Sequence, residues 1–229
     1  DYDWKGSNTT LSILDDGTGM NNEQLIQAMR PGSRNPLEER TSNDLGRFGL
    51  GLKTASFSQS RKFTVFSKAK DYKPIYWTWD LDYVNQAQAW KLIRHIPDEE
   101  YWTHKIETLE TGTCVVWWDL DRITKDTAED NEEAKAKFMG IMDSIKSHLS
   151  MVFHRYMDEG LKIYFREREI KAWDPFMIGA DGLQTKPETR LEGGSIRIKG
   201  FVLPHRSKLS AEQYNYGKGP KDSWTGHQG

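Results

Sequence analysis

The sequence predicts an α/β (α+β) protein, arranged as a two-layer sandwich with helices on one face of a sheet. Three observations indicate this class. Short apolar, β-branched and aromatic runs typical of strands recur along the chain. Segments with apolar residues at every third or fourth position, typical of helices, lie between these runs. Hydrophobic residues make up 36% of the chain and charged residues 29%, which suits a globular protein with a core.

The first elements surround a glycine-containing turn. A short strand over residues 10–14 delivers Asp15 at its end. The following helix is capped by Asn21 or Asn22, because an amide side chain can accept a hydrogen bond from the first free N–H groups of a helix. Residues 33–45 are polar and charged, and this composition predicts a mobile loop.

The remaining elements follow from the same patterns. In chain order they are a helix over residues 49–60, strands over 62–67, 74–81 and 113–118, a long helix over 131–158, and strands over 161–170 and 195–203. The periodicity of the long helix predicts that it packs across a sheet. We place a domain boundary near Gly160, which gives domains of residues 1–160 and 161–229; the loop after Ile170 is the alternative position.

Bulk composition excludes several classes of protein. The net charge of −2 gives no overall attraction to nucleic acid or to an anionic membrane. The single cysteine, Cys114, excludes an internal disulfide framework, and its apolar surroundings predict a buried thiol in a reducing compartment. We find no apolar run long enough to span a membrane and no signal-peptide pattern, so we expect a cytoplasmic protein. The six histidines lack metal-ligand spacing, which predicts no transition-metal site.

Two glycine-rich segments carry the candidate chemistry. The first runs from Asp15 to Met20 and reads Asp-Asp-Gly-Thr-Gly-Met. The second runs from Gly46 to Lys53, reads Gly-Arg-Phe-Gly-Leu-Gly-Leu-Lys and opens a helix. A fixed carboxylate can accept a hydrogen bond from the amino group of a purine, and free N–H groups at a helix N-terminus favour polyphosphate. Together the segments predict a divided nucleotide site; two unrelated turns are the alternative.

The commoner nucleotide motifs do not fit. A Walker A loop requires Gly-Lys followed by Ser or Thr, whereas Leu52 separates Gly51 from Lys53. The dinucleotide fingerprint requires a third glycine at fixed spacing, where this chain has Asn22.

The paired segments instead resemble the GHKL ATPases: gyrase, the ninety-kilodalton heat-shock chaperones, histidine kinases and MutL. The amino-acid sequence of the second segment is most similar to that of MORC-type ATPases and their bacterial relatives. The resemblance implies the Bergerat ATP-binding fold, followed here by part of a transducer-like α/β domain. It also implies ATP and Mg²⁺ as cofactors and a homodimer in the ATP-bound state. Nucleic acid is a further candidate partner of the intact protein.

The resemblance also implies roles for residues. Asp15 would contact the adenine amino group, and Thr113 would support that contact, often through water. Met20 would pack on the adenine ring, with ordinary core packing as the alternative. Lys53 would reach a phosphate, with a solvated helix lysine as the alternative. The candidate nucleotide-binding residues are Asp15, Gly17, Gly19, Met20, Gly46, Arg47, Phe48, Gly49, Leu50, Gly51, Leu52, Lys53 and Thr113.

The implied activity is a nucleotide-driven switch. ATP would order the loop over residues 33–45 as a lid and would favour dimerisation. Arg34, Arg40 and Arg47 are candidate lid residues, with ordinary surface charges as the alternative. Hydrolysis in the intact protein would reset the state. The alternative is a non-hydrolysing nucleotide-sensing or protein-interaction module. A histidine-kinase catalytic domain fits less well, because the predicted loop is long and a transducer-like tail follows.

Catalytic residues are not assigned. GHKL ATPases carry a helix ahead of the aspartate segment that supplies a glutamate base and a magnesium-binding asparagine, and we find no such pattern. Glu38 and Glu39 are poor substitutes, because a mobile loop positions a base badly. The segment Gln184-Thr185-Lys186 resembles a transducer motif, but its position favours coincidence. We therefore expect the printed chain to bind nucleotide without efficient hydrolysis.

Overall fold

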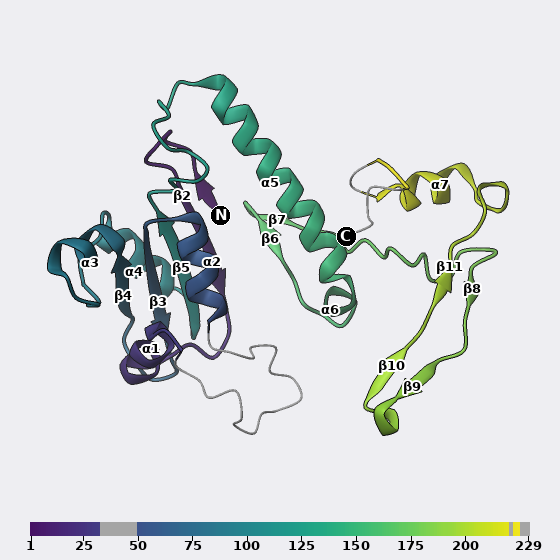
Figure 1. Ribbon diagram of the computed structural model, residues 1–229, viewed down its shortest axis with the longest axis horizontal. Helices are drawn as coiled ribbons and strands as arrows, with labels where there is room; N and C mark the ends of the chain where they lie inside the picture. Colours follow the sequence, from purple (N-terminus) through teal and green to yellow (C-terminus); the bar gives the residue numbers. More distant parts are fainter. Residues whose placement is uncertain (33–49, 220–221, 225–229) are drawn as a thin grey trace. The chain divides into compact units, whose positions relative to one another are not determined.

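The chain folds into two compact units. The computed structural model describes residues 1–32, 50–219 and 222–224. The units are residues 1–139 and 140–229, and the division falls inside helix α5 (Glu132–Val152) (Figure 1). The predicted functional division at residue 160 stays a prediction.

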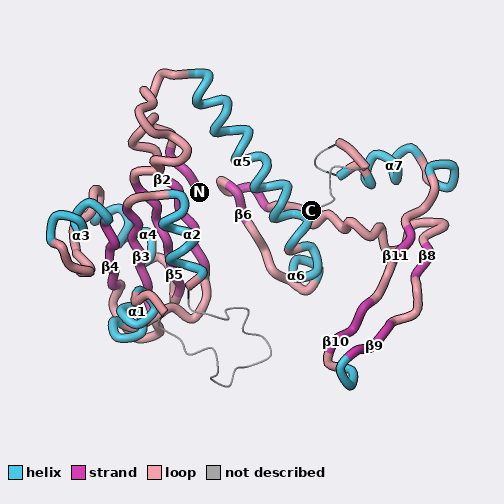
Figure 2. The backbone as a smooth tube through the Cα atoms, viewed as in Figure 1, coloured by secondary structure: helices cyan, strands magenta, loops and turns pink. Residues whose placement is uncertain are grey.

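The first unit is built on a five-stranded sheet in which every neighbouring pair is antiparallel. The strand order is β1-β2-β5-β3-β4 (Figure 2). The strands are β1 (Tyr2–Asp3), β2 (Thr10–Asp15), β3 (Lys62–Lys68), β4 (Ile75–Asp80) and β5 (Gly112–Trp118). The predicted α+β arrangement of a sheet with helices is confirmed.

Helices α1 (Asn22–Met29) and α2 (Gly51–Gln59) cover one face of the sheet. Alternate residues of the strands meet them there. The buried residues of this core are Leu25, Met29, Phe63, Val65 and Trp79. The indole nitrogen of Trp79 also donates to the carbonyl oxygen of Met29 at 3.0 Å, which satisfies one of the free carbonyls at the end of α1.

The opposite face carries a second core, which the sequence did not predict. Phe66 and Val116 point to this face, because side chains alternate along a strand. Helix α4 (Glu99–Glu107) packs Trp102 and Ile106 against them, four residues apart and hence on one helix face. Cys114 belongs to this core; the prediction of a buried thiol is confirmed, and burial raises the pKa of Cys114 to about 11.

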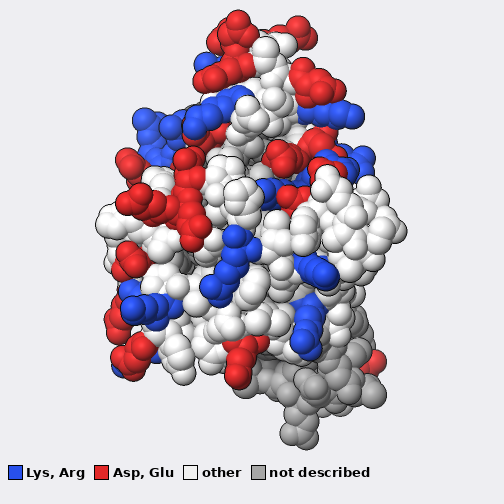
Figure 3. Space-filling model, turned by 90° about the vertical axis from the view of Figure 1, so that its left-hand side faces the viewer, with Lys and Arg blue, Asp and Glu red and all other residues white. Residues whose placement is uncertain are grey.

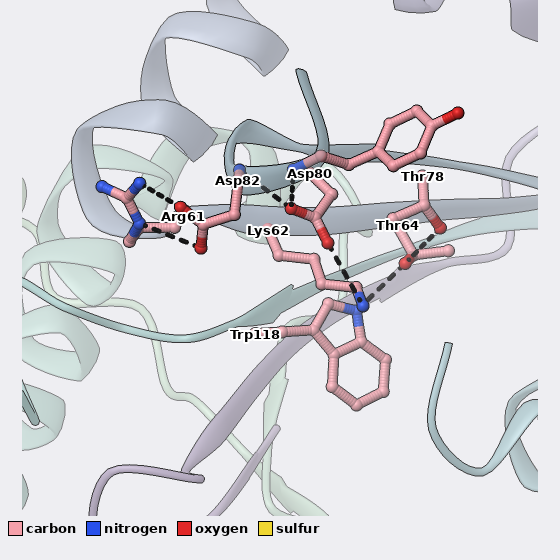
Figure 4. A network of polar contacts seen from close by, with 8 residues as sticks. Arg61, Lys62, Thr64, Thr78, Asp80, Asp82 and Trp118 are labelled. Carbon is pink, nitrogen blue, oxygen red and sulfur yellow. Dashed lines mark hydrogen bonds and ion pairs between the residues drawn. The ribbon is translucent and has the colours of Figure 1, made fainter. Parts of the chain in front are cut away.

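A polar network fixes one end of strands β3 and β4 (Figure 4). The hydroxyl groups of Thr64 and Thr78 lie 2.9 Å apart in the sheet interior, and the indole nitrogen of Trp118 donates to Thr64 at 3.0 Å. Lys62 and Asp80 form an ion pair of 3.6 Å beside them. Asp80 also caps helix α3 (Leu81–Ala87) by accepting from two of its backbone N–H groups. The candidate site lies at the opposite end of β3 from this network.

The helix predicted over residues 131–158 is interrupted. Helix α5 ends at Val152, and α6 (His154–Asp158) follows after Phe153. The carbonyl oxygen of Ser150 accepts from the N–H of Trp173, and the Ser150 hydroxyl donates to Lys171. In a continuous helix that carbonyl would instead accept from the N–H of residue 154, so the diverted bond explains the break.

The second unit contains short strand pairs in place of the two predicted long strands. Arg166 and Glu167 both have positive φ, which makes a tight hairpin turn inside the predicted strand 161–170. The segment 195–203 divides between two different partner strands. The elements are β6 (Tyr164–Phe165), β7 (Arg168–Glu169), β8 (Gln184–Thr185), β9 (Thr189–Leu191), β10 (Ile196–Ile198), β11 (Phe201–Val202) and α7 (Ala211–Gly217).

Candidate functional site

Three polar side chains form a row across three neighbouring strands. Asp15 at the end of β2 pairs with Thr113 of β5, and Thr113 pairs with Ser67 of β3. Directly paired residues point to the same face of an antiparallel sheet, with Cβ atoms about 4.5–5.5 Å apart. The row therefore places a carboxylate beside a hydroxyl group on the face that carries α1 and α2, and two of its members were predicted as site residues.

Ser67 is the member of the row that sequence reasoning missed. Its hydroxyl oxygen accepts from the backbone N–H of Met20 at 2.8 Å and lies 3.1 Å from the carbonyl oxygen of Gly112. It also lies 3.0 Å from the hydroxyl oxygen of Thr113. A serine that ends an apolar strand carries no distinctive signal; only the register with Thr113 identifies it.

The turn after β2 shapes the first glycine-rich segment. The N–H of Gly17 donates to a carboxylate oxygen of Asp15 at 2.9 Å, a local bond that orients the carboxylate. Gly19 has φ of +63°, and a Cβ atom there would collide with the carbonyl oxygen of Lys68. Only glycine meets both conditions at this position. The turn thus lies directly against the end of β3.

Met20 links the turn to the core. Its side chain is half-buried and packs against the cluster that contains Leu25 and Phe63. Ordinary core packing, the alternative to an adenine contact, therefore explains the buried part of the Met20 side chain. A contact between its exposed part and adenine stays a prediction.

The helix that follows the second glycine-rich segment begins at Gly51. Leu50 precedes it and its side chain is exposed, whereas Leu52 packs against the α1 side of the core. The first turn of α2 carries no acidic residue and no side-chain cap. The first N–H groups of a helix favour an anion in general, so a phosphate contact at this helix start stays a prediction.

The other predicted phosphate contacts cannot be placed. Gly46, Arg47, Phe48 and Gly49 lie outside the described residues, as does the predicted loop over residues 33–45 with its arginines and glutamates.

Lys53 is buried, so the alternative of a solvated helix lysine is wrong. Only 4% of the residue is exposed, and its Nζ atom donates to the carbonyl oxygen of Ala28 at 2.7 Å. Burial lowers the pKa of Lys53. A phosphate contact stays a prediction, and it would require this ammonium group to leave Ala28.

The described residues contain no group of three or more His, Cys, Asp or Glu side chains placed to bind a metal ion. Mg²⁺ is usually held by one or two protein carboxylates together with the phosphates of the nucleotide, so its binding here stays a prediction. Within the same residues, no helix is both long and apolar enough to cross a membrane. Basic and acidic side chains are interspersed over the face shown in Figure 3.

The antiparallel sheet and its helices hold the polar row of candidate site residues at one end of β2, β3 and β5. Residues 2–113, just under half of the chain, match the family described as histidine kinase-, DNA gyrase B-, and HSP90-like ATPase. This segment contains every predicted site residue. The match supports the GHKL superfamily and, with it, binding of ATP. No curated protein matches the chain. The closer relation to MORC-type ATPases stays a prediction.

Proposed function

We propose that the chain is an ATP-binding domain of the GHKL type. The observation that carries the proposal is the pairing of Asp15, at the end of β2, with Thr113, at the start of β5. A carboxylate held by the Gly17 N–H beside a hydroxyl group can accept hydrogen bonds from an exocyclic amino group. A base without that amino group would leave the carboxylate unpaired, at a cost of about 1–3 kcal/mol.

The phosphates would lie toward the start of α2. Among the described residues, no acidic side chain lies in its first turn and no side chain caps it, and the helix dipole adds a partial positive charge. Glycines 46 and 49, together with Gly51, would extend this row of N–H groups, as the resemblance implies. The base and phosphate ends would then come from segments separated along the chain, as a divided site requires.

The nucleotide would act as a conformational signal. We propose that the γ-phosphate orders residues 33–45 and favours a homodimer, and that hydrolysis in the intact protein resets the state. The described groups near Asp15 are suited to hold a base, and we assign none of them to the activation of water. Binding is therefore the part of the function that the geometry supports, and hydrolysis is attributed to the intact protein by family resemblance.

Calorimetric titration of the chain with ATP, ADP and GTP tests the proposal. We expect ATP and ADP to bind and GTP to bind at least about tenfold more weakly, because guanine presents a carbonyl oxygen where adenine presents its amino group. Equal affinity for ATP and GTP would contradict the assignment of the base site. Limited proteolysis with a non-hydrolysable ATP analogue adds an independent readout, since residues 33–45 should gain protection when it binds.

A further inference from the structure

We propose that Ser67 is a positioning residue that fixes the Thr113 hydroxyl group as a hydrogen-bond acceptor toward the base. The described row would then present two hydrogen-bond acceptors, Asp15 and Thr113, and no donor. Such a row would select a base edge that carries an amino group. This inference rests on the proposed function, because it concerns the specificity of the same site.

The Ser67 hydroxyl group can form a limited number of hydrogen bonds. A serine hydroxyl has one proton to donate and two lone pairs to accept with. Ser67 has three partners within hydrogen-bond distance, the Met20 N–H at 2.8 Å, the Gly112 carbonyl at 3.1 Å and the Thr113 hydroxyl at 3.0 Å. The three hydrogen bonds that the Ser67 hydroxyl can form therefore equal its three partners in number.

Only one arrangement of protons satisfies all three contacts. The Met20 N–H can only donate, so it occupies one lone pair of Ser67. The Gly112 carbonyl can only accept, so it receives the Ser67 proton. The remaining lone pair of Ser67 must accept the Thr113 proton. The Ser67 residue is fully buried, so water cannot supply a substitute partner without a cost.

Thr113 then faces the site with lone pairs alone. Its proton points along the row toward Ser67, on the side away from Asp15, because Thr113 lies on the central strand of the three. The Asp15 carboxylate is also an acceptor when ionised. A water molecule that donates one proton to each of them would again present only lone pairs to the base.

This arrangement favours adenine over hypoxanthine. The adenine amino group offers two N–H donors, one for each acceptor or for a bridging water. Hypoxanthine carries a carbonyl oxygen at the same ring position. This oxygen is an acceptor and would face Asp15 and Thr113, which are acceptors too, so no hydrogen bond could form. Removal of Ser67 would free the Thr113 proton, and the hydroxyl could rotate to donate to that oxygen.

The test is the ratio of the dissociation constants for ITP and ATP, measured by calorimetry on the full chain. We expect the wild type to prefer ATP by at least about tenfold. Ser67→Ala should reduce this ratio to within about threefold, because Thr113 can then adapt to either base. Ser60→Ala is the matched control: Ser60 is also buried, but its hydroxyl bonds to the carbonyl oxygen of Ser56, away from the row. It should leave the ratio unchanged.

A double mutant separates positioning from a general structural effect. In a Thr113→Val background there is no hydroxyl to orient, so adding Ser67→Ala should change the ratio by less than about twofold. An equal loss of selectivity with and without the Thr113 hydroxyl would overturn the inference, as would a folded Ser67→Ala protein that keeps the wild-type ratio.

Two further results keep the test decisive. If Ser67→Ala does not fold, Ser67→Cys is measured instead, because the thiol keeps the shape but bonds weakly. It should lower the ratio, and an unchanged ratio would refute the inference. If the wild type binds neither ATP nor ITP, the proposed function fails; if it prefers ATP and the Ser67 variants do so equally, only the role of Ser67 fails.

Discussion

The Nζ atom of Lys53 donates a 2.7 Å hydrogen bond to the carbonyl oxygen of Ala28, which joins the first turn of α2 to the last turn of α1. A buried ammonium group satisfies a helix carbonyl that has no partner within its own helix. The position of the α2 N-terminus, where the phosphates are proposed to lie, therefore depends on a charged group inside the protein.

The first prediction follows from the lowered pKa of Lys53. The unfolded chain holds this proton up to a higher pH than the folded chain does, since burial lowers the folded pKa below 10.5. Stability rises with pH wherever the unfolded state binds more protons. Urea unfolding should therefore show the wild type gaining stability relative to Lys53→Met as pH rises toward 10.5. A wild type that loses stability relative to Lys53→Met as pH rises toward 10.5 would contradict the assignment.

The elements that the sequence predicted well are those whose pattern decides their structure locally. The strands of the first unit carry strong β-forming runs. Asn21, one of the two predicted caps, forms a capping box with Gln24 through bonds of 3.0 and 2.9 Å. The break at Phe153 was not predictable, because it depends on a bond between Ser150 and the distant Trp173.

The site shows the same limit. Asp15 and Gly19 belong to a short motif and could be identified from sequence. Ser67 acts through register, and strand pairing joins residues 46 positions apart along the chain. The burial of Lys53 likewise depends on how two helices pack, which the periodicity of one helix does not determine.

The second prediction concerns the network at the other end of β3. Thr64→Val leaves the Trp118 indole N–H and the Thr78 hydroxyl without their shared partner in the interior. We expect a loss of about 1–3 kcal/mol in the free energy of unfolding. Thr64→Ser keeps the oxygen atom and should retain more of the stability in the same denaturant titration. A larger loss for Thr64→Ser than for Thr64→Val would show that packing, and not hydrogen bonding, dominates there.

The third prediction tests the turn after β2. Gly19→Ala combines a positive φ with a collision against the carbonyl oxygen of Lys68, so it should destabilise the protein by more than about 2 kcal/mol. Gly51→Ala is a matched stability control, because a Cβ atom there meets no atom of the described residues within 4 Å. It should change stability by less than about 1 kcal/mol. Thermal unfolding of both variants makes the comparison, and similar melting temperatures would argue against a tight turn at Gly19.

The last prediction is that Asp15→Asn weakens ATP binding by at least about tenfold while the fold is kept. The asparagine oxygen can still accept the Gly17 N–H, so the turn should survive. Its amide nitrogen, however, places a donor where the adenine amino group also donates, and the favourable contact becomes an unfavourable one. Asp16→Asn serves as the matched control, because Asp16 is an exposed neighbour outside the row and should bind ATP as the wild type does. Calorimetry gives the affinities and circular dichroism checks the fold. A folded Asp15→Asn protein with unchanged ATP affinity would contradict the assignment of Asp15 to the base site.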